Sequence, residues 1–173
     1  MGPKRNIVLF GFMGTGKTRV GRAVAEGLGM TYADLDDLIE AREGTTISEI
    51  FATKGEPHFR KIEAEVAAEA AKLDRHVIAT GGGVVLNEAN IRALEESGVG
   101  ICLSATAEEI FRRVRREKHR PLVAVEKPLV RIRELLAYRA PFYSRVEHQV
   151  ETTGKPVEAV VEEVVAIWRR ECE

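Results

Sequence analysis

The chain has 173 residues, a length typical of one domain, and its 45% apolar content argues against a disordered protein. It carries 26 Lys and Arg against 27 Asp and Glu, a formal net charge of −1. We therefore expect no nucleic-acid or membrane partner bound through the field of the whole protein, and we expect a monomer. Cys102 and Cys172 show no metal-type spacing, and no segment resembles a signal peptide, which predicts a cytoplasmic protein.

Short apolar runs alternate with longer segments of helical periodicity, which predict strands and helices respectively. The expected strands are 6–10, 30–33, 76–79, 99–103 and 148–151. The expected helices are 17–28, 36–42, 46–52, 56–72, 88–97, 107–116, 129–146 with a kink or break at Pro141, and 157–170. This alternation predicts a three-layer α/β fold with a five-stranded parallel sheet, whose ligands bind beyond the C-terminal ends of the strands.

Residues 11–18 read Gly-Phe-Met-Gly-Thr-Gly-Lys-Thr between the first strand and the first helix. This is the phosphate-binding P-loop motif G-x-x-x-x-G-K-[ST] in the context that it requires. Its glycines let backbone N–H groups curl around a polyphosphate, Lys17 supplies a charge for the β- and γ-phosphates, and Thr18 supplies a hydroxyl for Mg²⁺. We therefore expect ATP and Mg²⁺ as cofactors, and the predicted nucleotide contacts here are Gly14, Thr15, Gly16, Lys17, Thr18 and Arg19.

Two carboxylates, Asp34 and Asp36, follow the second predicted strand. On an extended segment they share one side, so one could hold a water on Mg²⁺ while the other binds or deprotonates an acceptor hydroxyl. Capping of the next helix by Asp36 or Asp37 is the alternative interpretation. A motor is disfavoured by the short chain and a GTPase by the lack of an N-K-x-D segment, which leaves a small-molecule kinase.

Further motifs follow the P-loop in a fixed order. From 11–18 onward the chain has Tyr32-Ala-Asp34-Leu-Asp36, Ile47-Ser-Glu-Ile-Phe51, Gly55-Glu-Pro-His-Phe59-Arg60-Lys-Ile-Glu63, Gly81–Gly83, Arg120-Pro-Leu and Arg139-Ala-Pro-Phe-Tyr143. With this ordered set the chain resembles the shikimate kinase family, within the nucleoside-monophosphate-kinase-like P-loop proteins, over nearly its whole length. The resemblance implies a single P-loop kinase domain over 1–173, with a substrate-binding segment over about 34–62 and a lid over about 113–127. It implies transfer of the ATP γ-phosphate to the 3-hydroxyl of shikimate, in chorismate and aromatic amino-acid biosynthesis.

The same resemblance implies roles for the residues that bind the acceptor. Arg60 and Arg139 match arginines that bind the shikimate carboxylate, for which a guanidinium fork is suited. Gly81–Gly83 match glycines whose backbone approaches the substrate. Asp36 matches the aspartate that contacts the hydroxyls and is the candidate base, and Asp34 matches the one near Mg²⁺.

Several neighbours of these residues have two interpretations. Glu63, three residues after Arg60, either orients Arg60 or touches a hydroxyl, and the pair taken alone is equally a surface salt bridge. Phe51 and Phe59 either wall the substrate pocket or pack in the core.

The segment 112–120 holds six Lys and Arg in nine residues, which alone indicates a solvated helix face or a nucleic-acid patch. The resemblance implies that Arg120 is the lid arginine that stabilises the transferring phosphoryl group, and that Arg113 lies against adenine. Family members often carry a further arginine in the loop after the last strand. Here 152–156 reads Thr-Thr-Gly-Lys-Pro. Lys155 therefore supplies the positive charge of that arginine but cannot stack on adenine as a guanidinium does.

The predicted catalytic residues are thus Lys17, Asp36 and Arg120, acting by positioning and electrostatic stabilisation. Two alternatives stay open. One is a kinase for another polyhydroxy acid such as gluconate. The other is a non-catalytic ligand-sensing domain on the same fold, which is expected to lack Lys17, Asp36 or the carboxylate arginines.

Overall fold

The computed structural model describes residues 4–117 and 125–173. Within them five strands form one sheet, in the order β2-β3-β1-β4-β5, and every neighbouring pair is parallel. The predicted three-layer α/β fold with a five-stranded parallel sheet is therefore confirmed. The strands are β1 (Asn6–Gly11), β2 (Thr31–Asp34), β3 (His76–Ala79), β4 (Gly98–Ser104) and β5 (His148–Glu151).

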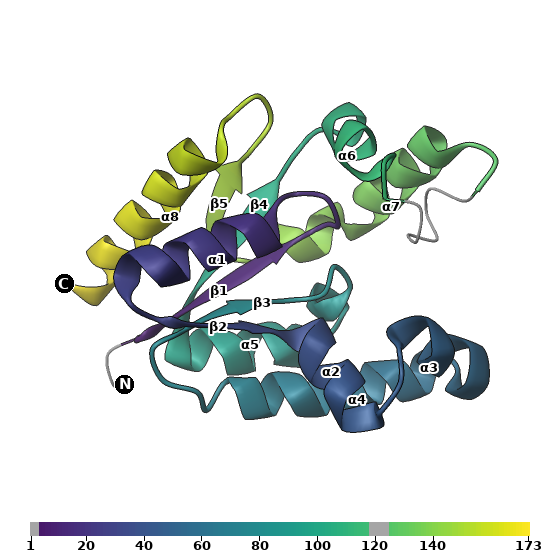
Figure 1. The fold of residues 1–173 in the computed structure, drawn as a ribbon, viewed down its shortest axis with the longest axis horizontal. Helices are drawn as coiled ribbons and strands as arrows, with labels where there is room; N and C mark the ends of the chain where they lie inside the picture. Colours follow the sequence, from purple (N-terminus) through teal and green to yellow (C-terminus); the bar gives the residue numbers. More distant parts are fainter. Residues whose placement is uncertain (1–3, 118–124) are drawn as a thin grey trace.

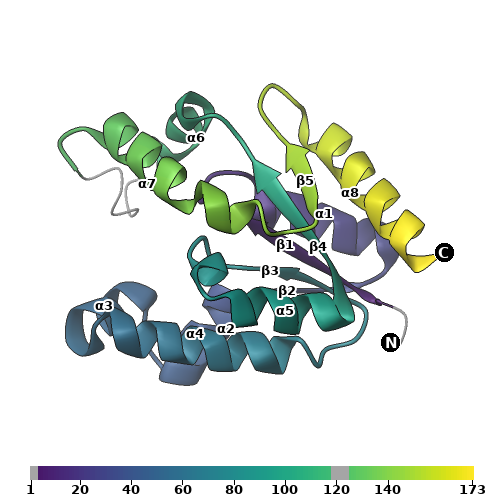
Figure 2. The ribbon, with the colours of Figure 1, turned by 180° about the vertical axis from the view of Figure 1, so that it is seen from behind.

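Helices cover both faces of the sheet. Helices α1 and α8 lie side by side on one face, and α4 and α5 lie on the other, where α6 and α7 also pack together (Figure 1, and from behind in Figure 2). The helices of the described residues are α1 (Lys17–Leu28), α2 (Leu35–Glu43), α3 (Ile47–Lys54), α4 (Glu56–Ala70), the 3₁₀ helix η1 (Val84–Leu86), α5 (Glu88–Ser97), α6 (Ala107–Val114), α7 (Pro128–Tyr143) and α8 (Val157–Cys172).

The central strand β1 divides the core in two. Successive side chains of a strand point to opposite faces, so Ile7 and Leu9 pack towards α1 and α8, while Val8 and Phe10 pack towards α4 and α5. All four are fully buried, which explains why β1 reads as an unbroken apolar run. This rigid strand leads directly into the segment 11–18 at the C-terminal edge of the sheet.

The start of α2 corrects one expectation. Asp34, rather than Asp36 or Asp37, caps this helix, because its Oδ1 accepts the backbone N–H of Asp36 at 2.8 Å. Asp36 therefore lies in the first helical turn instead of on an extended segment. The two carboxylates stay close because of the cap and not because of strand alternation.

Helix α7 corrects a second expectation. It continues through Pro141 and ends at Tyr143, two residues later, instead of breaking at the proline or reaching Val146. A proline in the last turn removes one intrahelical N–H donor close to the helix end, where few bonds remain to be lost. Both cysteines are free thiols, Cys102 buried and Cys172 exposed. No helix in the described parts of the chain has the length and apolarity needed to cross a membrane.

Candidate active site

A cavity of about 800 Å³ opens where the C-terminal ends of β1, β2, β3 and β5 meet the first turns of α1 and α8. This is the edge of a parallel sheet at which ligands bind. Residues that are far apart in the sequence line one space here. Those predicted for the site and found in the lining are Gly14, Thr15, Gly16, Lys17, Thr18, Arg19, Asp34, Asp36, Gly81, Gly82, Arg113 and Lys155.

The segment 11–18 curls into the N-terminus of α1. Gly14 and Gly16 have φ of 77° and 96°, a region that side chains rarely adopt, and Gly16 is the N-cap of the helix. The Thr15 hydroxyl is buried and donates to the carbonyl of Phe12 at 2.8 Å, which holds the loop closed. Backbone N–H groups and the positive end of the helix dipole thus face the cavity, an arrangement that binds phosphate.

Lys17 lies across the same loop. Its Nζ donates to the carbonyl of Gly11 and, at 3.1 Å, to that of Phe12. These contacts place the ammonium at the end of β1, on the floor of the cavity. Burial raises the pKa of the nearby Asp36, and the charge of Lys17 opposes part of that rise.

The two carboxylates after β2 have different surroundings. Asp34 is engaged by its own segment, since Oδ1 caps α2 and Oδ2 accepts the Tyr32 hydroxyl at 3.2 Å. For Asp36, burial first, then the nearby Asp34 charge, raise the pKa to about 6 against the lowering effect of Lys17. A carboxylate whose pKa lies this close to neutrality is suited to accept a proton from a hydroxyl.

The three glycines Gly81–Gly83 follow β3, and each lies against a different functional side chain. A Cβ on the first would lie 2.8 Å from Asp36 Oδ1, and a Cβ on the second 3.3 Å from Arg139 Nη1. A Cβ on the third would lie 2.5 Å from Arg60 Nη1. Any side chain here would displace one of these groups, so the run of glycines is what allows them to converge.

Arg60 is fixed by carboxylates of its own helix. Its Nη1 donates to Glu63 Oε1 at 2.8 Å, and its Nη2 reaches Glu56 Oε1 at 3.3 Å. Burial raises the pKa of Glu63 although Arg60 opposes this, and the Glu63 side chain is 3% exposed. Of the two predictions for Glu63, the structure therefore shows the orienting contact with Arg60, and its pairing is not a surface salt bridge.

Arg139 comes from the opposite side of the cavity, on α7. Its guanidinium lies 5.5 Å from the centroid of the Phe12 ring, and its Nε is buried without a hydrogen-bond partner among the described residues. Arg60, Arg139 and Gly83 do not line the cavity itself. Arg139 lies against Gly82, which does line it, and Arg60 lies against Gly83. Phe59 packs in the core, whereas Phe51 is 38% exposed, with their ring centroids 4.7 Å apart.

Arg113 joins three segments on the nucleotide side. Its Nε donates to Glu109 Oε1 at 2.9 Å, and its Nη1 donates to the Gly14 carbonyl at 3.1 Å. Nη1 and Nη2 also donate to the hydroxyl and carbonyl of Thr152, at 3.0 and 3.2 Å. With its edge bonded in this way, the guanidinium can offer its flat faces to a stacking ring.

Glu109 and Thr152 were not predicted for this site. Hydrogen bonds from Arg112 first, and from Arg113, lower the pKa of Glu109 to about 2, so it holds both arginines as an anion. Its position four residues before Arg113 was a usable signal, because such pairs meet on a helix. Thr152 lies 39 residues from Arg113, and no sequence spacing indicates that contact.

Two predicted residues stand apart. Lys155 lines the cavity but donates to Glu163 Oε1 at 2.6 Å, so its ammonium is held by α8. Arg120 lies outside the described residues, as does part of the predicted lid.

Comparison with known proteins decides the family. The family model described as shikimate kinase matches residues 13–169. The shikimate kinase of Caldanaerobacter subterraneus is 50% identical over 164 residues, which cover 95% of this chain and 96% of that protein. The chain belongs to the shikimate kinase family. Members of this family are ATP-dependent kinases, so the fold and the site carry phosphotransferase chemistry.

Solved structures agree with this assignment. The structure of shikimate kinase from Acinetobacter baumannii in complex with shikimate superposes with a TM-score of 0.89 at 36% identity, covering 96% of this chain and 93% of that one. A gluconokinase from Sinorhizobium meliloti superposes with a TM-score of 0.60 at 16% identity, covering 99% and 95% of the two chains. The second likeness shows a shared fold and no more, so the shikimate kinase assignment stands over the gluconate alternative.

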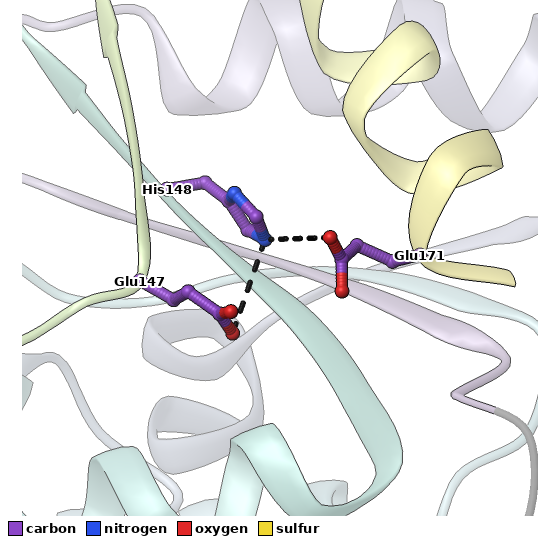
Figure 3. A group of neighbouring side chains, drawn as sticks. All are labelled: Glu147, His148 and Glu171. Atoms are coloured by element: carbon purple, nitrogen blue, oxygen red, sulfur yellow. Dashed lines mark ion pairs between the residues drawn. The ribbon is translucent and has the colours of Figure 1, made fainter.

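A separate ionisable group lies at the opposite end of β5 from the cavity. His148 Nε2 is 3.5 Å from Glu171 Oε1 and 3.9 Å from Glu147 Oε2, with the imidazole lying between the two carboxylates (Figure 3). None of the three residues lines the cavity. The group ties the start of β5 to the end of α8 and takes no part in the site.

Proposed function

We propose that the chain transfers the γ-phosphate of ATP to the 3-hydroxyl of shikimate, giving shikimate 3-phosphate and ADP for chorismate and aromatic amino-acid biosynthesis. The contact between Gly81–Gly83 and the P-loop gives the main structural support. A Cβ on Gly82 would lie 3.6 Å from the backbone N of Met13, so the glycines touch the phosphate-binding segment. An acceptor hydroxyl bound beside them would lie next to the terminal phosphate, as in-line transfer requires.

On the nucleotide side, Lys17, with Gly14, Thr15, Gly16 and Arg19 around it, is proposed to hold the ATP phosphates. Mg²⁺ fits the cavity because Thr18 and Asp34 both offer oxygen donors there, the ligand type that this ion prefers. When bound, Mg²⁺ would neutralise charge on the β- and γ-phosphates. Asp34 has lone pairs left for a metal-bound water, since the Tyr32 hydroxyl and the Asp36 N–H occupy only part of its carboxylate.

On the acceptor side, Arg60 and Arg139 are proposed to bind the shikimate carboxylate through two guanidinium groups. The buried, unpaired Nε of Arg139 gives a donor available to such an anion. Asp36 accepts the proton of the attacking hydroxyl, and the Gly81–Gly83 backbone lies along the ring. The carboxylate and the reacting hydroxyl are thereby held at opposite ends of one small acid.

The lid over about 113–127 and the role of Arg120 stay part of this proposal. Arg120 would stabilise charge on the transferring phosphoryl group, and closure over the site would exclude water. Arg113 and Lys155 are proposed to flank the adenine, with Arg113 supplying a stacking face. We further propose a cytoplasmic monomer without nucleic-acid or membrane partners, in keeping with its balanced charge; light scattering during gel filtration tests the monomer.

The direct test is ADP release by the purified chain with Mg²⁺ and ATP, with and without shikimate. Shikimate-dependent ADP release is expected, with one phosphate on the 3-oxygen when the product is examined by ³¹P and ¹H NMR. Gluconate at the same concentration is the matched acceptor control, and it is expected to give the same rate as buffer. Preference for gluconate would overturn the acceptor, and ATP binding without transfer would overturn the enzyme.

A further inference from the structure

Tyr143, the last residue of α7, lies against the acceptor glycines. Its hydroxyl donates to the carbonyl oxygen of Gly82 at 2.7 Å, across 61 residues of sequence. The residue is buried, 8% exposed, and burial raises the pKa of its hydroxyl to about 12. The hydroxyl therefore keeps its proton, and with it the bond to Gly82, throughout the physiological range.

The same hydroxyl is linked to Arg139. The two residues are one helical turn apart on α7. Burial raises the pKa of the Tyr143 hydroxyl, and the nearby Arg139 charge acts against that rise, so the guanidinium lies close to the hydroxyl. The Arg139 Nη1 lies 3.3 Å from where a Gly82 Cβ would be. Arg139, Tyr143 and Gly82 thus form a closed set of contacts between α7 and the loop after β3.

The contact with Tyr143 also fixes the orientation of the Gly82–Gly83 peptide. The Gly82 carbonyl and the Gly83 N–H belong to one planar trans peptide and point in opposite directions. Holding the carbonyl on Tyr143 therefore turns the Gly83 N–H away from α7. Glycine alone resists such rotation poorly, because it has wide backbone freedom, so an external hydrogen bond is needed to fix this peptide.

We propose that Tyr143 is a positioning residue for the acceptor, whose hydroxyl ties Arg139 to the Gly82–Gly83 peptide and so sets the distance between the carboxylate site and the glycine backbone. The proposal rests on the proposed function, because it takes Arg139 and the glycines as the acceptor site. It assigns Tyr143 no contact with ATP.

The test compares Tyr143→Phe with Tyr138→Phe by steady-state kinetics in both substrates. Tyr138 lies on the same helix but is 64% exposed, so its hydroxyl serves as the matched control. Tyr143→Phe leaves the half-buried Gly82 carbonyl without its donor, and the KM for shikimate is expected to rise roughly tenfold. The KM for ATP and kcat are expected to stay within about twofold, and Tyr138→Phe is expected to match the wild type.

A double-variant cycle checks the link to Arg139. If the three groups act as one unit, Tyr143→Phe combined with Arg139→Lys raises the KM for shikimate by clearly less than the product of the two single effects. Independent, multiplicative effects would contradict the link. An unchanged KM for shikimate in Tyr143→Phe, or an equal rise for ATP and shikimate, would overturn the proposal.

A second measurement covers the case in which Tyr143→Phe folds poorly. A fluorinated tyrosine at position 143 keeps the ring and the hydroxyl but ionises at lower pH. Its KM for shikimate is expected to rise at alkaline pH relative to the wild type at the same pH, and an identical profile would overturn the proposal. The two failures are separable: a wild type without shikimate-dependent ADP release removes the proposed function, whereas an active wild type with an indifferent Tyr143 removes only this inference.

Discussion

The nucleotide half and the acceptor half of the proposed site are built in different ways. The nucleotide half is largely one continuous segment, residues 11–18, whose backbone and helix dipole supply most of the proposed phosphate contacts. The acceptor half takes single side chains from α2, α4 and α7 and brings them together on Gly81–Gly83. The first half is set by local conformation, and the second by the packing of distant elements.

The two halves are expected to differ in how well they tolerate substitutions elsewhere in the protein. Backbone donors stay in place when distant side chains change, so the nucleotide half is expected to tolerate substitutions in α4 and α7. The acceptor groups depend on helix positions, and a shift of about 1 Å in either helix is enough to lose productive alignment. Substrate specificity is therefore expected to depend on the acceptor half, which packing changes disturb more easily.

Lys17→Ala makes the strongest break in the nucleotide half. The Lys17 ammonium lies across the P-loop, where it is proposed to hold the ATP phosphates, so kcat/KM is expected to fall about 10³- to 10⁵-fold. Shikimate binding by calorimetry is expected to stay near the wild-type value, because the acceptor groups are on other elements. Lys61→Ala, exposed on α4, is the matched control. Loss of shikimate affinity in Lys17→Ala would show that the two halves are not separable.

The sequence predicts the features set by local conformation better than those set by the packing of distant elements. The P-loop, the sheet and the acceptor residues Arg60 and Arg139 are readable because motif and periodicity are local or belong to an ordered set. The Asp34 cap and the continuation of α7 through Pro141 were mispredicted, since each depends on a competition between neighbouring backbone bonds. The contacts of Arg113 with Thr152 and of Tyr143 with Gly82 exist only once the chain has folded.

Asp36→Asn tests the group that lies between the two halves. Without the base, kcat is expected to fall about 10²- to 10³-fold. In the wild type, kcat/KM for shikimate is expected to fall roughly tenfold per pH unit below about pH 6, as the raised pKa of Asp36 requires. Asp37→Asn, exposed in the same helical turn, is the control and is expected to keep both the rate and the pH profile.

The same substitution has an opposite effect on stability. The folded-state pKa of about 6 lies above the ordinary value of 3.8, so the folded protein binds the proton more tightly between these values, and the wild type loses stability as the pH rises through them. At pH 7, Asp36→Asn is expected to raise the free energy of unfolding by up to about 3 kcal/mol, and near pH 4 by little. Urea unfolding at both pH values measures this, and a variant that is less stable at pH 7 would contradict the burial of the charge.

Arg139→Ala breaks the acceptor half. Loss of one charged donor from the carboxylate site is expected to raise the KM for shikimate about 10- to 100-fold, with the KM for ATP nearly unchanged. Shikimate methyl ester, which lacks the carboxylate charge, tests this contact directly. The wild type is expected to bind the ester much more weakly than the acid, whereas Arg139→Ala is expected to show a much smaller difference in affinity between the two. Arg131→Ala, exposed on the same helix and paired with Glu134, is the control. Equal discrimination by Arg139→Ala and the wild type would remove Arg139 from the carboxylate site.

Glu109→Gln is expected to have the smallest kinetic effect, and it tests whether the adenine side of the nucleotide half depends on side-chain packing. Glu109 holds Arg112 and Arg113 as an anion, and through Arg113 it ties α6 to the carbonyl of Gly14 and to Thr152. A neutral amide accepts weaker hydrogen bonds from these arginines than the carboxylate does, so the KM for ATP is expected to rise about three- to tenfold. Here the nucleotide half resembles the acceptor half, since its adenine side depends on side chains from separate elements.

Glu108→Gln is the control for this last experiment, because Glu108 precedes Glu109 on the same helix and pairs with Arg133 at the exposed surface. Its KM for ATP is expected to be unchanged, since exposed pairs contribute little. If Glu109→Gln raises the KM for shikimate as much as that for ATP, α6 orders the whole cavity rather than its adenine side. If only the KM for ATP rises, the P-loop separates the two halves. Its backbone contacts would then be insensitive to distant side chains, whereas the proposed adenine contacts would depend on packing as much as the acceptor site does.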